Sequence, residues 1–162
     1  MLNYNQPIKE QKSYQGLQMS EIYPVMKLII RGKKREFLSA IGKSLNMVLP
    51  TKANTSTQSE KLTALWLSPD EWMIFSNNVV KENTNTYDTE TLLNKNISKL
   101  NLGAVIDVTD QYVRITLKGD KIYDLFQTGS PFNFNEFKQK IGSVTQTIIA
   151  KIDVIIHNQN QN

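Results

Sequence analysis

The strongest constraint on the fold is the segment from Leu62 to Ser76, in which two apolar runs flank Ser68-Pro69-Asp70-Glu71. Serine at the first position and proline at the second favour a type I β-turn, and aspartate is tolerated at the third. The stretch LWLSPDEWMIF therefore predicts a β-hairpin whose tip carries two acids. As a general acid–base pair, Asp70 and Glu71 would need partial burial and a neighbour that separates their pKa values. The local sequence supplies neither, so turn chemistry is the favoured interpretation.

The remaining apolar patterns predict an α+β fold. Runs rich in β-branched residues or with alternating polarity indicate strands, and stripes spaced three and four residues apart indicate helices. The predicted strands come in hairpin pairs with single helices between them, which differs from a regular strand–helix alternation. The two halves look like two copies of one β-α-β-β unit. Strands are predicted for residues 23–31, 104–109, 112–118, 144–150 and 153–157, and helices for 33–46, 88–101, 119–128 and 134–141.

The organisation of the chain indicates one domain. Residues 1–20 are polar and predict an N-terminal arm, residues 21–157 predict a single α+β domain, and the polar residues 158–162 predict a disordered tail. The N-terminus has no apolar core of the kind that a signal peptide requires. The apolar runs are far shorter than the roughly 20 residues that a membrane helix needs. We therefore expect a cytoplasmic, soluble protein that does not interact with a membrane.

The charged residues give little support to nucleic-acid binding. The formal net charge is +4, and the basic residues cluster only at Arg31 and Lys33 to Arg35. Nucleic-acid binders usually carry a longer basic stripe with aromatic residues in it. A solvated start of a helix is the favoured interpretation, although cations at a helix N-terminus oppose the helix dipole and leave an anionic partner such as RNA as a minor alternative.

No set of residues predicts a catalytic or metal site. The chain has no cysteine and one histidine, His157, which excludes thiolate chemistry and multi-histidine metal sites. His157 precedes the polar tail and is expected on the surface. Neither a dinucleotide-binding glycine motif nor a phosphate-binding loop occurs. Asp107 is unusual inside a strand, and it is either a ligand-binding residue, a partner of Arg114, or a residue on the wet face of a sheet, which is the favoured interpretation.

Four ordered segments resemble the gamma subunit family of heterotetrameric sarcosine oxidase. They are MVLPTKANT (47–55), LWLSPDEWMIF (65–75), AVIDVTDQYVRITLKGDKIYDLFQTGSPFNFNEF (104–137) and GSVTQTIIAKIDVIIH (142–157). Each is weak alone, and the ordered set is more specific. The chain departs from the family pattern at Gln111-Tyr112, where basic residues are expected, at Ser130, where cysteine is frequent, and at Asn133, where aspartate is usual.

The resemblance implies a function that the residues alone do not. The heterotetramer oxidatively demethylates sarcosine to glycine, reduces oxygen to hydrogen peroxide, and passes the one-carbon unit to tetrahydrofolate or releases it as formaldehyde. FAD, FMN, NAD and tetrahydrofolate are expected in the partner subunits: a large folate-domain (alpha) subunit, a flavin (beta) subunit and a small delta subunit. The gamma subunit is similar in fold to the folate-binding domain of the glycine-cleavage T-protein, which agrees with the duplicated pattern.

The resemblance leaves two hypotheses open. The first is a non-catalytic subunit that binds no cofactor itself and packs against the large folate-domain subunit. The second is a stand-alone folate-binding or T-protein-like methyl-transfer protein, whose pocket would be lined by Asp107 and Arg114. Under the first hypothesis, the candidate residues for the partner interface are Trp66, Asp70, Trp72, Phe132 and Phe134.

Overall fold

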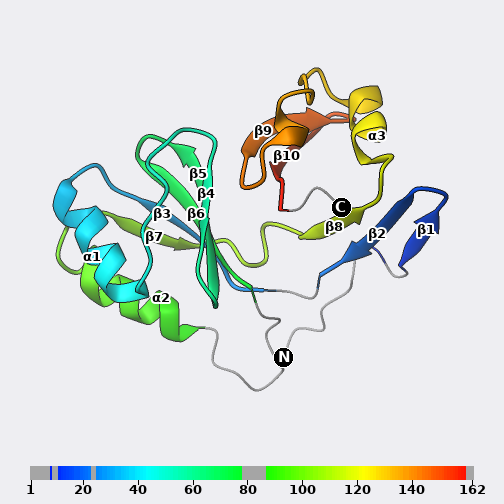
Figure 1. Ribbon diagram of the computed structural model, residues 1–162. Helices are drawn as coiled ribbons and strands as arrows, with labels where there is room; N and C mark the ends of the chain where they lie inside the picture. The colour runs from blue at the N-terminus through cyan, green and yellow to red at the C-terminus, as the bar shows by residue number, and fades with distance from the viewer. Residues whose placement is uncertain (1–7, 9–10, 23–24, 78–86, 160–162) are drawn as a thin grey trace.

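The computed structural model describes residues 8, 11–22, 25–77 and 87–159, and its centre is an antiparallel five-stranded sheet. The helices between residues 35 and 98 lie at one side of this sheet, and residues 115–157 lie at the other (Figure 1). The strand order is β4-β5-β6-β3-β7, with β3 Lys27–Arg31, β4 Ser56–Gln58, β5 Leu62–Ser68, β6 Glu71–Ser76 and β7 Ala104–Asp107.

Helices cover one face of the five-stranded sheet. They are α1 Arg35–Leu45, α2 Tyr87–Leu93 and the π-helical η1 Asn94–Ser98. The apolar stripe of α1 places Phe37 and Ile41 in the core, where Phe37 packs on Trp72 with ring centroids 5.9 Å apart. Asn46 ends the helix in the left-handed conformation, with φ of 49°.

Gly103 allows the approach to β7. A Cβ atom at this position would lie 2.2 Å from the Arg31 carbonyl oxygen and 2.7 Å from the Phe37 ring. Only glycine lets the chain pass this close to the core and then pair as the edge strand β7.

A C-terminal hairpin covers the other face of the sheet. It consists of β9 Val144–Ile149 and β10 Ile152–His157. Because side chains alternate between the faces of a strand, one face of the hairpin carries Val144 and Ile155 against the sheet. The opposite face carries Ile149 and Ile156 into a cluster of aromatic side chains. The hairpin is therefore packed on both of its faces.

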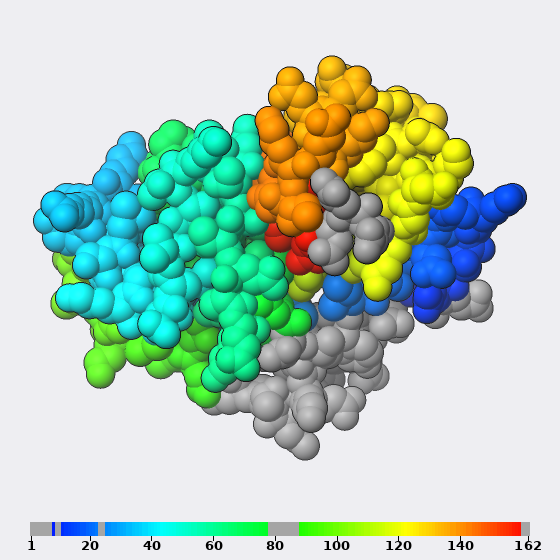
Figure 2. Space-filling model, in the orientation of Figure 1, coloured from blue at the N-terminus to red at the C-terminus, as the bar shows by residue number. Residues whose placement is uncertain are grey.

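The second half of the chain surrounds this hairpin. The segment from helix α3 Ile122–Gly129 to the 3₁₀ turn η2 Phe137–Gln139 supplies an aromatic cluster, in which Phe134, between the two elements, is fully buried. Strand β8 Ile115–Lys118 belongs to a separate three-stranded sheet, order β1-β2-β8, with β1 Lys12–Tyr14 and β2 Leu17–Glu21. In Figure 2 the hairpin lies between the five-stranded-sheet half and the α3 half.

The structure confirms the α+β fold and the hairpin at Ser68–Glu71, and it corrects several boundaries. The helix predicted for 88–101 becomes π-helical at Asn94. The strand predicted for 112–118 begins only at Ile115. The helix predicted for 134–141 is reduced to the single turn η2.

Two terminal segments differ from what their polarity suggests. The polar arm predicted for residues 1–20 contains β1 and most of β2, although residues 1–7 lie outside the described part. The tail predicted as disordered begins with Asn158, which is buried and donates to the carbonyl oxygens of Phe137 and Lys140, each at 3.0 Å. Residues 160–162 lie outside the described residues.

Within the described part, the helices are too short or too polar to cross a bilayer.

We predict that Phe37→Ala lowers the free energy of unfolding by about 3–5 kcal/mol, because it removes a fully buried ring and leaves a cavity against Trp72. The matched control is Val48→Ala at a side chain that is 78% exposed, which should change stability by less than about 0.5 kcal/mol. Urea unfolding followed by tryptophan fluorescence measures both. Equal effects of the two substitutions would contradict this assignment of the core.

Candidate functional site

The two acids of the β5–β6 turn are engaged in local contacts. The Ser68 hydroxyl donates to Asp70 Oδ1 at 2.9 Å, and this bond, with a smaller contribution from Lys33, lowers the pKa of Asp70. Lys33 Nζ lies 3.6 Å from Asp70 Oδ2, and Arg31 Nε lies 3.8 Å from Glu71 Oε2. The turn thus faces the basic cluster, and its acids are ion-paired at the surface, where Glu71 also lines a shallow, open hollow.

Where the hairpin meets the sheet, Arg114 and His157 lie against the ring of Phe75, and Lys27 stands opposite Phe75 in the β3–β6 pairing. We call Lys27, Ser56, Phe75, Arg114 and His157 the Phe75 cluster. Its members come from β3, β4, β6, the segment before β8, and the end of β10. The cluster therefore joins the sheet to the second half of the chain.

His157 is part of the Phe75 cluster and is not the surface residue that the sequence predicted. Its Nε2 lies 2.8 Å from Ser56 Oγ, which itself donates to the Gly142 carbonyl oxygen at 2.9 Å. Since the single hydroxyl proton is used there, Nε2–H donates to Ser56, and the buried Nδ1 is an acceptor without a partner within the described residues. Burial, reinforced by the charge of Arg114, lowers the pKa of His157 to about 4.

Arg114 and Asp107 do not form the ion pair that the sequence left open. The Arg114 guanidinium carbon lies 4.4 Å from the centre of the Phe75 ring, and Nη1 donates to the Ser76 carbonyl oxygen at 3.4 Å. Asp107 is exposed at the end of β7, where Oδ1 accepts from the Thr109 amide at 2.8 Å. Asp107 acts here as a turn acceptor, and its role as a ligand-binding residue stays a prediction.

Lys27 is the residue that sequence reasoning missed. It lies in an apolar run, and its side chain is only 5% exposed. Nζ donates to the Val25 carbonyl oxygen at 3.0 Å, and burial lowers the pKa of Lys27. Val25 and Ile29 both face the hairpin side of the sheet. Because side chains alternate along a strand, Lys27 must lie on the same buried face, and this spacing was the sequence signal for a buried lysine.

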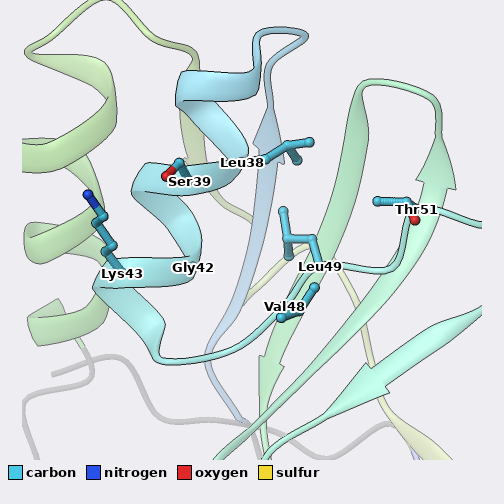
Figure 3. Close-up of a pocket in the computed structure, with 7 residues that line it drawn as sticks. All are labelled: Leu38, Ser39, Gly42, Lys43, Val48, Leu49 and Thr51. Atoms are coloured by element: carbon cyan, nitrogen blue, oxygen red, sulfur yellow. The ribbon is translucent and has the colours of Figure 1, made fainter.

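Neither of two shallow hollows in the described surface holds the Phe75 cluster. One, of about 370 Å³, lies between α1 and the segment after it. Figure 3 shows its apolar lining by Leu38 and Leu49, with Lys43 extending away from Leu49. The other, of about 390 Å³, lies between the sheet and the hairpin and is lined by Ile29, Leu67, Glu71, Tyr112, Gln146, Thr147, Ile148, Asp153, Val154 and Ile155. Among the described residues, no group of three or more acidic or histidine side chains is placed to hold a metal ion.

The structure divides the predicted interface residues into two groups. Trp72, only 3% exposed, donates from Nε1 to the Pro50 carbonyl oxygen at 2.8 Å, and Phe134 is fully buried. Trp72 lies in the core on the helix side of the sheet, and Phe134 lies in the aromatic cluster, so both are interior residues of this chain and are not surface anchors. Trp66, Asp70 and Phe132 are partly exposed and stay candidates.

An inverted polarity pattern before β8 adds new surface candidates. Arg114 points inward onto Phe75, whereas its neighbours Val113 and Ile115 are each 47% exposed. The Ile22 amide donates to the Arg114 carbonyl oxygen, so this segment continues the β2–β8 ladder as extended chain. Alternation along it therefore forces the two apolar side chains outward when the cation is inward.

Both the sequence and the fold of this chain are similar to those of known proteins. A family model described as "Sarcosine oxidase, gamma subunit family" matches residues 32–162. A chain of the heterotetrameric sarcosine oxidase from Corynebacterium sp. U-96, solved in complex with pyrrole 2-carboxylate, has a similar fold. Its TM-score is 0.73 at 18% sequence identity, over 94% of this chain and 75% of that chain. Among curated proteins, none has a sequence that matches this chain.

We predict that His157 makes the stability of the chain depend on pH between about 6.5 and 4. Its pKa falls from 6.5 in the unfolded chain to about 4 in the folded one, so the unfolded chain binds the proton more readily in this window. The contribution is fully present above pH 6.5 and is lost progressively as the pH falls to 4, by at most about 3 kcal/mol. The measurement is urea unfolding of the wild type and His157→Gln at several pH values. A stability difference between the two that is constant from pH 7 to pH 4 would contradict the assignment.

Proposed function

The chain belongs to the sarcosine oxidase gamma subunit family, and we propose that it is a non-catalytic subunit of a cytoplasmic heterotetrameric sarcosine oxidase. The observation that carries the proposal is the family match, which spans residues 32–162. The similar fold of a chain from a heterotetrameric sarcosine oxidase supports it.

In the proposed complex, the chemistry takes place on the partner subunits. Sarcosine is oxidatively demethylated to glycine, oxygen is reduced to hydrogen peroxide, and the one-carbon unit passes to tetrahydrofolate or leaves as formaldehyde. We propose that FAD, FMN, NAD and the folate site belong to the large folate-domain (alpha) and flavin (beta) subunits, and that a small delta subunit completes the complex. The gamma chain then contributes packing surface and no reacting group.

The contacts of the candidate catalytic groups support a non-catalytic role. Asp70 and Glu71 are ion-paired at an open turn. Ser56 and His157 resemble a nucleophile and a base, but the Ser56 hydroxyl donates to the Gly142 carbonyl oxygen and not to the imidazole. The imidazole is therefore not placed to accept the serine proton as a general base, and the Ser56–His157 hydrogen bond has a structural role.

The exposed apolar side chains support docking to a larger chain. Single exposed apolar residues are ordinary on a protein surface. The segment before β8 differs, because it turns a cation inward and two branched apolar side chains outward, and exposed apolar surface of this kind is typical of interaction sites. We propose that Val113 and Ile115 belong to the partner-facing surface, and that the partly exposed Trp66, Asp70 and Phe132 are candidates for separate contacts with the partners. Other strongly exposed apolar side chains in the described part include Leu100, Ile106, Ile141, Ile148 and Ile152.

The order of elements supports the finer description of the fold. Strand β3 is followed by helix α1 and the β5–β6 hairpin, and strand β8 is followed by helix α3 and the β9–β10 hairpin. We propose that these are two copies of one unit, as in the folate-binding domain of the T-protein. A stand-alone folate-binding or methyl-transfer protein would need a pocket lined by Asp107 and Arg114. Neither residue lines either of the two hollows described above, so this alternative has less support.

We predict that Val113→Asp combined with Ile115→Asp weakens assembly at least tenfold, because it places two charges in an apolar contact. The matched control is Val48→Asp, an exposed valine on the helical side of the sheet. The measurement is the yield of co-purified large subunits after co-expression with each tagged variant, together with the melting temperature of each free chain.

The expected result is loss of the large subunits with the double variant, their retention with the control, and similar melting temperatures for both free chains. Retention of stoichiometric large subunits by the double variant would contradict the assignment of this surface. Failure of the wild-type chain to co-purify with them would contradict the proposed function itself.

A further inference from the structure

The hollow between the five-stranded sheet and the β9–β10 hairpin has an acidic lining on a basic protein. Its charged lining residues are Glu71 and Asp153, whereas the formal net charge of the chain is +4. Glu71 faces Arg31 across 3.8 Å, which is an ion pair without a hydrogen bond. Asp153 is exposed and has no basic group within 4 Å among the residues that the structure describes. The charge of the hollow therefore favours a cationic occupant.

The acids stand beside an apolar surface. The buried part of the lining includes Ile29 and Leu67, which are 7% and 8% exposed. Tyr112 and Ile148 line the same hollow and are 37% and 45% exposed. Ile106 stands opposite Ile29 in the β3–β7 ladder, so it shares that face of the sheet, and it is 48% exposed. Large apolar side chains that gather at the surface in this way are typical of interaction sites.

The shape of the hollow suits a protruding side chain better than a free small molecule. Its volume of about 390 Å³ is within the range of small-ligand sites. Such sites enclose most of the surface of their ligand, whereas this hollow is shallow and open. A side chain that belongs to a docked protein needs no enclosure by this chain alone, because the surrounding interface excludes water from it.

We propose that this hollow is the docking site for an arginine side chain of a partner subunit. Arginine has an aliphatic stem that can cover apolar surface, and a guanidinium group that stacks on aromatic rings and donates to carboxylates. The hollow offers the apolar floor, the ring of Tyr112, and the carboxylates of Glu71 and Asp153. Lysine matches this set less well, because its compact ammonium group lacks a plane that can stack. The inference rests on the proposed subunit role, for which it names the chemistry of one contact.

The test is the dissociation constant of the full-length chain in the co-expressed complex, measured by dilution of the purified complex. Glu71→Gln combined with Asp153→Asn should raise this constant at least tenfold, because the arginine would stay buried without a carboxylate. The matched control is Asp124→Asn combined with Glu136→Gln. It also removes one aspartate and one glutamate charge, from exposed ion pairs outside the hollow, and should change the constant less than about twofold.

A second measurement identifies the occupant. Because the chain has no cysteine, Ile148→Cys at the edge of the hollow gives a single position for a benzophenone label. Irradiation of the labelled complex should cross-link a partner peptide that contains an arginine. The same label at Val48→Cys, on the helical side of the sheet, should not capture that peptide.

The outcomes separate this inference from the proposed function. Equal dissociation constants for the hollow variant and its control would overturn the inference alone, and so would a captured peptide with no arginine. Failure of the wild-type chain to co-purify with large subunits would contradict the proposed function and the inference together. The melting temperatures of the free variants should match that of the wild type, because both substituted acids are at the surface.

Discussion

The structure depends on the burial of both faces of the β9–β10 hairpin. Val144 and Ile155 pack on the five-stranded sheet, and Ile149 and Ile156 pack on the aromatic cluster of Phe126, Phe134 and Phe137. Val144 is buried, and the three isoleucines are partly buried against these clusters, so the hairpin removes apolar surface from water on both of its faces. The hairpin therefore joins the two halves into one body, and any movement of the halves would require it to expose one of its apolar faces.

The polar contacts at this junction fix the position of the hairpin more than they stabilise it. Ser56, Gly142 and His157 are linked in one hydrogen-bonded chain, and Gln146 Nε2 donates to the Leu67 carbonyl oxygen at 2.7 Å. A register shift of one residue would turn His157 away from Ser56 and put Ile156 in its place. The same alternation places Arg114 against Phe75 and leaves Val113 and Ile115 outside, so the geometry that closes the junction also creates the apolar surface.

Sequence reasoning succeeded where the determining interactions are local. The Ser68–Glu71 turn, the stripe of α1 and the C-terminal hairpin follow from turn chemistry and periodicity within short segments. It failed at β1 and β2, whose polar residues form strands because β2 pairs with β8 and β1 pairs with β2. It also failed at Trp72 and Phe134, whose burial depends on residues that are distant in the chain. The Phe75 cluster could not be predicted because Ser56 and His157 are 101 residues apart in the chain, and only the tertiary fold brings them together.

The central claim is that the chain functions by assembling with larger subunits and does not itself perform chemistry. Native mass spectrometry of the complex purified through a tag on the chain, from cells that express it at its natural level, tests this most directly. The account predicts a heterotetramer that contains one copy of the chain and bound flavin. The same purified complex is expected to produce hydrogen peroxide when sarcosine is added. A free monomer that binds tetrahydrofolate and transfers a one-carbon unit by itself would contradict it.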